Sequence, residues 1–263
     1  MRKFKHYIIT RFNLGLYSPG ARIGISPDEW MRHRVKIFTE FTLPSVMAQR
    51  CQDFTWLVLF DSRTPQEFYD ILYAFGYPNM KLLWVDVSNQ EIPVSHDFLS
   101  NLVKQIVEPG DYDLITTRVD NDDAIRNDVI SIIHEWYVSK PYSWTIKFPL
   151  GYLLDLNKNE IFQMQYWVNN CVTLIEGSLD ARTVYCAGHT TLSADAMVAV
   201  GQKPRWIQIV HSENIANTSV DSGSRVVYRD KPVTLSDLAE FGIDPAGLPD
   251  LNKHIFPTAQ RPA

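Results

Sequence analysis

The first half of the chain alternates short runs of hydrophobic residues with stretches in which hydrophobic positions recur every three to four residues. The continuous runs predict strands at residues 6–12, 54–60, 82–87 and 112–117. The recurring patterns predict helices that start after Ser26 and Thr64 and that cover residues 97–107 and 127–138. Four strand–helix units therefore follow one another to about residue 138, which predicts an α/β protein with a doubly wound, mainly parallel sheet.

Two short segments carry the residue types that start helices. Ser26, Pro27 and Glu29 combine an N-cap hydroxyl, a proline suited to the first helical position and the acidic residue of a capping box. Segment 64–67 repeats this pattern and predicts the start of the next helix. Pro44 has no backbone N–H, so we expect it to end or kink the first helix.

The second half of the chain has a different pattern, rich in strands and weak in helix signals. Strands are expected within residues 144–154, 161–168, 171–175 and 206–210. Short polar turns between them indicate antiparallel or mixed pairing. From residue 217 onward Pro, Gly, Asp and Ser accumulate, so we expect a single domain over residues 1–217 and an irregular C-terminal arm over residues 218–263.

Charge and composition narrow the class of protein. The 25 basic and 30 acidic residues give a formal charge of -5 without any long basic run, which disfavours a nucleic-acid partner. Cys51, Cys171 and Cys186 form no CxxC pair, so a disulfide framework or zinc ribbon is not indicated and a cytoplasmic location fits. No segment approaches the roughly 20 apolar residues of a membrane span. Peripheral membrane contact stays open.

The acidic run Asp120-Asn121-Asp122-Asp123 follows the fourth predicted strand. Three carboxylates in four residues repel one another, and a divalent cation such as Mg²⁺ or Mn²⁺ would relieve that repulsion. The same residue types also favour a plain turn or a helix cap. The position at the carboxyl end of a buried strand favours the site, because a doubly wound sheet binds its ligand there.

Several ordered segments of the chain resemble the GT-A class of nucleotide-sugar glycosyltransferases, and more closely the group described as rhamnosyltransferases. The matching pieces are residues 9–13, 43–45 with Gln49, 54–58 leading to Asp61, 117–124, and 206–208 followed by His211 and Asn214. The resemblance implies a GT-A-like fold with a Rossmann-like nucleotide-binding half at about residues 1–125. A β-rich acceptor-side half would then occupy about residues 126–217.

The resemblance also implies roles for particular residues. Contacts to the nucleotide sugar would come from Thr10, Arg11, Phe12, Asp61, Arg118 and Asp120. A divalent metal, Mn²⁺ or Mg²⁺, would be held by Asp122, Asp123 and His211. For Arg118 a solvated or ion-paired role is an equal alternative, and His211 could simply be a hydrogen-bonded residue at a strand end.

An inverting transfer needs a base that takes the proton of the acceptor hydroxyl. Glu176 and His189 are the candidates in the β-rich half, and Asp155 and Asp195 are weaker ones. Glu176 before Gly177 is equally typical of a turn, and His189 of a structural hydrogen bond. Inversion and retention of configuration both stay open.

The resemblance therefore predicts a metal-dependent glycosyltransferase. It would move a sugar such as rhamnose from a nucleotide diphosphate to a glycan or lipid-linked acceptor. A sugar nucleotidyltransferase is one alternative, but the first strand is not followed by a glycine-rich phosphate loop with a lysine. A non-catalytic protein that binds carbohydrate or nucleotide is the other, and the intact acidic run argues against it.

Overall fold

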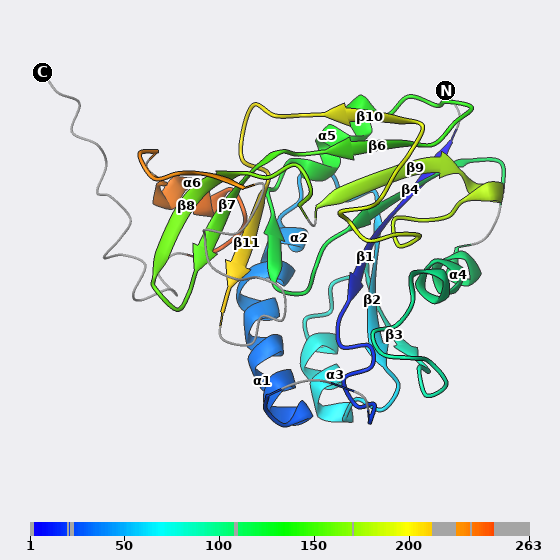
Figure 1. Ribbon diagram of the computed structural model, residues 1–263, viewed down its shortest axis with the longest axis vertical. Coiled ribbons are helices and arrows are strands. Elements are labelled where there is room, and N and C mark those ends of the chain that lie inside the picture. The colour runs from blue at the N-terminus through cyan, green and yellow to red at the C-terminus, as the bar shows by residue number, and fades with distance from the viewer. Residues whose placement is uncertain are drawn as a thin grey trace, which may run out of the picture.

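Two β-sheets form the framework of the protein (Figure 1). The computed structural model describes residues 3–19, 21, 24–107, 110–169, 171–211, 225–231 and 233–244. The larger sheet has the strand order β10-β6-β9-β4-β1-β2-β3, and the smaller one has the order β12-β8-β7-β11-β5. The α/β class with a mainly parallel first half, predicted from the sequence, is confirmed.

The strands and helices have the following bounds. The larger sheet contains β1 (Phe4–Arg11), β2 (Thr55–Asp61), β3 (Met80–Val85), β4 (Asp113–Arg118), β6 (Trp144–Lys147), β9 (Val172–Gly177) and β10 (Ala196–Ala199). The smaller sheet contains β5 (Asp123–Ile125), β7 (Leu150–Asp155), β8 (Glu160–Gln165), β11 (Trp206–Val210) and β12 (Val226–Tyr228). The helices are α1 (Pro27–Ile37), α2 (Leu43–Met47), α3 (Gln66–Tyr73), α4 (His96–Ile106), α5 (Val129–Trp136) and α6 (Leu235–Ala239), with a π-helical turn at Phe38–Thr42 and a 3₁₀ turn at Ser178–Asp180.

The directions of the strands determine which strand ends lie along the same edge of the larger sheet. Strands β3, β2, β1 and β4 are all parallel, and the order of the chain reverses between β1 and β4. Strand β9 is antiparallel to both β4 and β6, so β6 runs parallel to β4. The carboxyl ends of β1, β4 and β6 therefore lie along the same edge, and the reversal between β1 and β4 is where such a sheet binds ligands.

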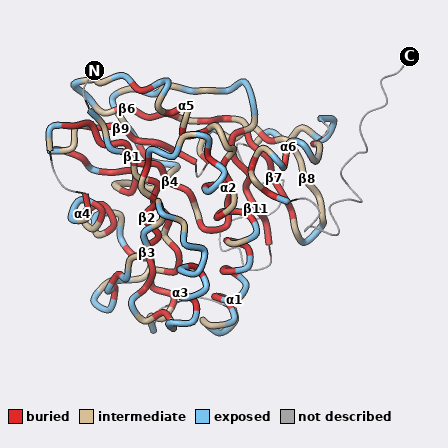
Figure 2. The backbone as a smooth tube through the Cα atoms, turned by 180° about the vertical axis from the view of Figure 1, so that it is seen from behind, coloured by how far each residue is buried: buried red, intermediate tan, exposed pale blue. Residues whose placement is uncertain are grey.

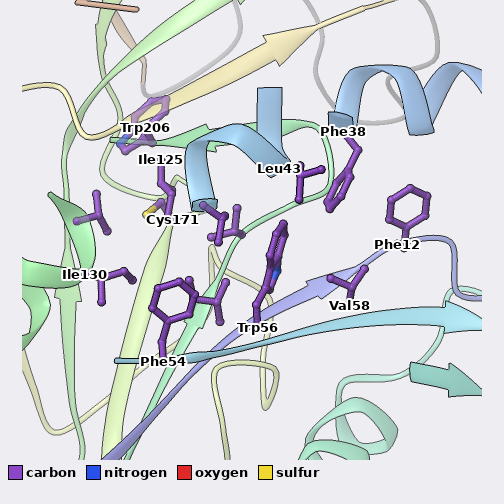
Figure 3. Packing of buried hydrophobic residues seen from close by; sticks show 14 of the residues in the cluster. Phe12, Phe38, Leu43, Phe54, Trp56, Val58, Ile125, Ile130, Cys171 and Trp206 are labelled. Atoms are coloured by element: carbon purple, nitrogen blue, oxygen red, sulfur yellow. The ribbon is translucent and has the colours of Figure 1, made fainter. Parts of the chain in front are cut away.

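Apolar residues cover both faces of the parallel strands. In β2, Trp56, Val58 and Phe60 belong to the cluster packed by α1, α2, α3 and α5. Figure 3 shows Phe12, Phe38 and Trp56 in this cluster, where the Phe38 ring contacts both other rings. Leu57 and Leu59 of β2 face the other cluster, which contains residues of α4 and of the segment 181–192. Burial on both faces explains why β2 is continuously apolar in the sequence. Figure 2 shows these buried strands inside exposed helix surfaces.

The helical backbone continues past Pro44 to Met47, contrary to the expectation that this proline ends the first helix. The Ser26 hydroxyl accepts the Glu29 N–H, as the sequence predicted, and α1 then runs into the π-helical turn and α2. The N–H of Leu43 bonds to the Phe38 carbonyl across the widened turn. A widened turn before a proline accommodates the missing donor, so the helical path is kept.

The second predicted capping box is also corrected. Helix α3 starts at Gln66 with no side-chain cap. The Thr64 hydroxyl instead donates to the Asp61 carbonyl (2.6 Å) and accepts from the Asn13 amide (2.8 Å). These tertiary contacts compete with the local cap for the same hydroxyl.

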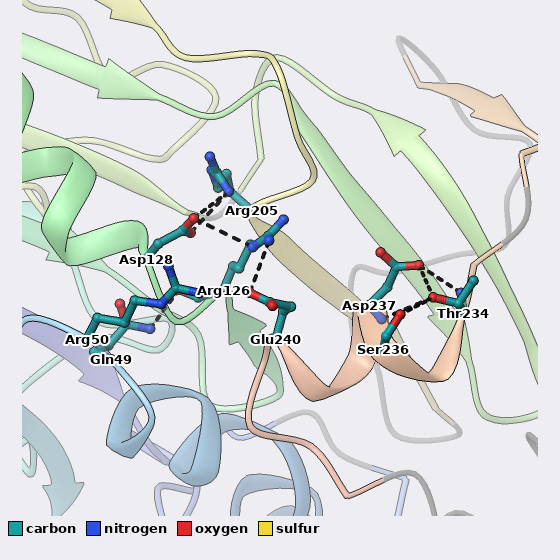
Figure 4. Close-up of polar contacts among 9 residues, drawn as sticks. All are labelled: Gln49, Arg50, Arg126, Asp128, Arg205, Thr234, Ser236, Asp237 and Glu240. Carbon is teal, nitrogen blue, oxygen red and sulfur yellow. Dashed lines mark hydrogen bonds and ion pairs between the residues drawn. The ribbon is translucent and has the colours of Figure 1, made fainter.

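The arm expected to be irregular contains ordered elements. Strand β12 pairs with β8, and Thr234 and Asp237 form a capping box that starts α6. Buried side chains from this part pack against the smaller sheet: Val233, Leu238, Phe241 and Ile243. Glu240 bonds to Arg50 at 3.2 Å and to Arg126 at 3.0 Å, which ties the segment to the rest of the protein (Figure 4). The irregular prediction was therefore wrong for residues 225–231 and 233–244, and residues 245–263 lie outside the described part.

No helix in the described part of the chain is both long and apolar enough to cross a membrane.

Candidate functional site

The acidic run connects the carboxyl end of β4 in the larger sheet to the start of β5 in the smaller sheet. Strand β4 ends at Arg118, and β5 begins at Asp123, so residues 119–122 cross from one sheet to the other. The Asp123 N–H bonds to the Asp120 carbonyl (3.3 Å), which makes the crossing a tight turn. The turn does not cap α5, because its N-cap residue is Asp128. The carboxylates of this turn therefore lie where the sheet reverses its order.

Asp120 forms a fork with Arg118. The Arg118 Nε and Nη2 atoms donate to the two Asp120 carboxylate oxygens at 2.8 and 3.0 Å. Burial acts to raise the pKa of Asp120, but the Arg118 charge and hydrogen bonds, with smaller contributions from Arg11 and His189, hold that pKa below its usual range. Asp120 is therefore ionised at neutral pH. Arg118 has the ion-paired role that the sequence left open.

Two aromatic side chains lie close to this ion pair. The guanidinium carbons of Arg11 and Arg118 lie 5.3 and 5.5 Å from the Tyr185 ring centroid. Burial and the Arg118 charge lower the pKa of His189 to about 4, with Asp120 opposing them and Arg11 and Lys147 adding to the decrease. His189 is therefore a neutral imidazole at pH 7, which can accept a proton.

Asp122 has a different set of neighbours. Its carboxylate forms an ion pair with Arg34 of α1, and its Oδ2 atom lies 3.3 Å from the His211 Nε2 atom. Burial acts to raise the pKa of Asp122, whereas the Arg34 charge and the His211 hydrogen bond hold it low. Arg34 also donates to the Asn121 side chain at 3.1 Å and lies over the Trp30 ring at 4.6 Å. Helix α1 thus fixes the second half of the acidic turn.

The three predicted metal ligands occupy two separate places. Asp122 and His211 are in contact, whereas the Asp123 carboxylate accepts the Ile209 N–H of β11 at 3.4 Å. Among the described residues, no three histidine, cysteine or acidic side chains converge into a cage for a metal ion. A carboxylate with an imidazole is a donor pair that a divalent transition metal accepts. These two residues fit a cation whose other ligands come from the substrate and from water.

Two of the predicted nucleotide contacts have side chains inside the core. The Thr10 hydroxyl donates to the Val119 carbonyl at 2.8 Å and accepts from the Trp56 indole at 3.0 Å. The Phe12 ring stacks on Phe60 with centroids 4.6 Å apart. Both side chains hold β1 against its neighbours in the core, so the structure does not present them to a ligand.

Asp61 organises the loop after β1. Its fully buried carboxylate accepts the Gly15 N–H at 3.0 Å and the Arg63 guanidinium at 2.7 Å. The Asn13 carboxamide accepts the Asp61 N–H at 3.1 Å from the same loop. Gly15 has a φ of 84°, which favours glycine at this bend. Asp61 therefore holds the loop after β1 against the loop after β2.

Glu176 lies at the opposite edge of the sheet. Its register partner is Leu114, six residues before Asp120, which corresponds to about 20 Å along a strand. The Glu176 carboxylate accepts the backbone N–H groups of Arg182 (2.9 Å) and Thr183 (3.0 Å). This corrects the expectation that Glu176 is the base, because the antiparallel register of β9 takes it away from the acidic turn.

The weaker base candidates also have local partners. Asp155 accepts the N–H groups of Asn157 and Lys158 in the turn after β7. Asp195 accepts both the N–H and the hydroxyl of Ser143. Of the four candidates, His189 is the one that lies among the residues of the acidic turn.

Three residues near the acidic turn or His189 were missed by the sequence reasoning: Arg34, Lys147 and Tyr185. Arg34 follows Trp30 by four residues on the buried face of α1, and an arginine on an apolar helix face is a signal that could have identified it. For Lys147 and Tyr185 the sequence carries no local signal.

The fold and site together define a class: an α/β protein with charged side chains gathered at the topological switch point of a mainly parallel sheet. The family model described as "Putative rhamnosyl transferase" matches residues 21–222. The chain belongs to this family, which confirms the resemblance predicted from the sequence.

Solved structures with a similar chain path are distant. TarS residues 1–349 of S. aureus, in complex with UDP, has 15% identity and a TM-score of 0.46, over 79% of this chain and 60% of that one. The longer S. aureus TarS has 14% identity and a TM-score of 0.45, over 79% and 37%. The glycosyltransferase GlyE of Streptococcus pneumoniae TIGR4 has 10% identity and a TM-score of 0.34, over 67% and 35%. This chain thus spans about 60% of the TarS 1–349 structures. No curated protein matches it.

Proposed function

We propose that this protein transfers a sugar, a deoxyhexose such as rhamnose, from a nucleotide diphosphate to a hydroxyl of a glycan or a lipid-linked acceptor. The observation that carries the proposal is the acidic turn at the switch point of the sheet, in a chain of the rhamnosyl transferase family. The nucleotide would lie over the carboxyl ends of β1 and β4, where such sheets bind their ligands.

Asp122 and His211 would hold a divalent cation, Mn²⁺ or Mg²⁺, together with oxygens of the substrate. Such an ion stabilises the negative charge that develops on a departing diphosphate. The chain itself prepares this place: Arg34 holds Asp122 ionised, and β11 brings His211 within 3.3 Å of its carboxylate.

His189 would accept the proton of the attacking hydroxyl. Its imidazole is neutral because burial and the neighbouring cations lower its pKa to about 4. A base with so low a pKa is weak, so its contribution depends on positioning next to the hydroxyl. Asp120, fixed by Arg118, would then orient the sugar or ribose hydroxyls beside it.

The test is the melting temperature of the purified protein with UDP, GDP, dTDP or CMP, each with Mn²⁺, Mg²⁺ or EDTA. A ligand that binds only the folded state raises that temperature. We expect one nucleotide to raise it in a metal-dependent way, and Asp122→Asn to remove the increase. Asp70→Asn is the matched control, because Asp70 is exposed on α3 and contacts Gln66.

Product analysis then separates the functions. Release of the nucleoside diphosphate from a nucleotide sugar supports glycosyl transfer. Release of pyrophosphate from a nucleoside triphosphate and a sugar phosphate would show nucleotidyl transfer instead of glycosyl transfer. Nucleotide binding without turnover in the presence of any metal would show a binding protein instead of an enzyme. If the nucleotide raises the melting temperature equally in EDTA, the nucleotide binds without a metal ion, which contradicts the proposed metal dependence.

A further inference from the structure

Lys147 lies at the same level of the sheet as Arg118. Both residues pair in register with Val172 of β9, one from each side. Register neighbours project to the same face of a sheet, and Val172 belongs to the cluster under α4. The side chains of Arg118 and Lys147 therefore emerge together at the carboxyl edge, on the face that carries Tyr185.

Arg11 joins them from β1. It follows Ile9 by two residues, so it projects to the same face, and Ile9 is the register partner of Arg118. The Arg11 guanidinium lies over the Tyr185 ring, and its Nε atom is buried without a hydrogen-bond partner. Arg11 and Arg118 thus lie over one buried phenol ring, and Lys147 projects to the same face of the sheet.

These cations differ in how their charge is balanced. Arg118 is balanced by Asp120 through two hydrogen bonds. Within the described part of the chain, neither Arg11 nor Lys147 has a carboxylate oxygen within salt-bridge distance, and the Arg11 charge acts on Asp120 only from farther away. Burial lowers the pKa of Lys147, which shows that its ammonium group is partly removed from water without compensation.

Partly buried cations without a counter-charge are costly, and a bound anion would remove that cost. Two cations without a salt-bridge partner match a phosphoryl group, which carries up to two negative charges. His189, a neutral imidazole near enough to these cations for their charges to lower its pKa, adds a ring nitrogen that can donate to a phosphate oxygen. A single carboxylate would balance only one of the two cations.

We propose that Arg11 and Lys147 form a phosphoryl-binding site above Tyr185, on the opposite side of the acidic turn from the Asp122–His211 pair. The site deepens the proposed function and rests on it for the identity of its substrate. A phosphoryl group can come from the diphosphate of the donor or from a phosphate-bearing acceptor, such as a lipid-linked sugar.

The first experiment measures the affinity of the full chain for inorganic pyrophosphate by calorimetry in EDTA, so that no metal contributes. We expect Lys147→Met to weaken binding about tenfold or more, the usual loss for a charge-assisted hydrogen bond. Lys147→Arg keeps the charge and should restore most of the affinity. Lys158→Met is the matched control, because Lys158 is exposed and lies beside Asp155 in the turn after β7.

Two further arms identify the source of the phosphoryl group. A tenfold weaker affinity of Lys147→Met for the nucleoside diphosphate assigns the site to the donor. An increase in KM for a phosphate-bearing acceptor, without a change for the same acceptor lacking phosphate, assigns it to the acceptor.

Unchanged pyrophosphate affinity in a folded Lys147→Met protein, verified by circular dichroism, overturns the proposal. So does equal weakening in Lys158→Met. The pyrophosphate arm needs no turnover, so its result stays interpretable if glycosyl transfer itself is not found.

Discussion

Asp120 and Asp122 stand two residues apart in one turn, yet they belong to different environments. Asp120 shares both oxygens with Arg118 from its own strand, and it lies beside Tyr185 and His189. Asp122 meets Arg34 from α1 and His211 from the end of β11. Because the turn crosses from one sheet to the other, its carboxylates are distributed between two sides.

The difference indicates a division of labour. On the Asp122 side, a carboxylate and an imidazole form a donor pair suited to a metal ion. On the Asp120 side, cations and a neutral imidazole lie near the carboxylate, and our proposals assign anion binding and proton transfer to them. A pattern that appears in the sequence as one acidic cluster is therefore divided between two environments.

The largest effect is expected from Asp122→Asn. Under the proposed function it removes a carboxylate that would hold the divalent cation beside the departing diphosphate, so we expect kcat to fall about 100-fold to 1000-fold. Steady-state kinetics under saturating Mn²⁺ measures this, with circular dichroism to show that the fold is retained. An equal loss in Asp120→Asn would break the distinction between the two sides.

Asp120→Asn should lower stability in addition to weakening the orientation of the substrate hydroxyls that we propose for Asp120. It leaves the Arg118 guanidinium buried without its counter-charge, which costs about 3 kcal/mol of unfolding free energy. Urea denaturation measures the loss. The double variant Asp120→Asn with Arg118→Met should recover a large part of it, because no charge is then buried alone; no recovery would mean that the ion pair is not the cause.

Protonation of His189, which lies on the Asp120 side, should make the stability of the protein depend on pH. The pKa of His189 is about 4 in the folded protein, compared with 6.5 in the unfolded chain. Between these two pH values the unfolded chain therefore binds the proton more readily than the folded protein does. Stability is then fully present above pH 6.5 and falls as the pH drops toward 4. One such group changes the free energy of unfolding by at most about 1.4 kcal/mol per pH unit. Because the His189 ring is partly exposed, we expect about half of that slope.

Urea denaturation at several pH values measures this slope, and His189→Gln should flatten it. The buried His6 and the half-buried His134 also have lowered pKa values, from burial first, and remain in the variant as an internal reference. A curve that is identical in wild type and His189→Gln would contradict the placement of His189 among the cations.

The smallest effect concerns the helix that supports the Asp122 side. Ser26 caps α1, which carries Arg34, and Ser26→Ala should cost about 1 kcal/mol. Thermal denaturation measures the loss, with the exposed Ser62→Ala as the control. If Ser26→Ala also lowers metal-dependent nucleotide binding, the position of α1 affects the geometry around Asp122. If nucleotide binding is unchanged, the cap contributes to stability alone.

Local patterns in the sequence determined the order of strands and helices in the first half. The periods of hydrophobic residues identified β1 to β4 and the helices between them, and the Ser26 cap set the start of α1. The acidic turn at a strand end and the segments shared with the family were also present in the sequence alone. These features depend on residues close together along the chain.

Tertiary structure decided which of these residues meet. Arg34 reaches Asp122 only because α1 docks on the sheet, and Glu176 leaves the site because β9 pairs antiparallel with β4. The hydroxyl of Thr64 bonds to Asn13 in the loop after β1 and is thereby withdrawn from its local cap. Hydrophobic periodicity fixes which face of an element is buried, but register and docking angles depend on contacts between distant segments, and a single sequence does not display those contacts.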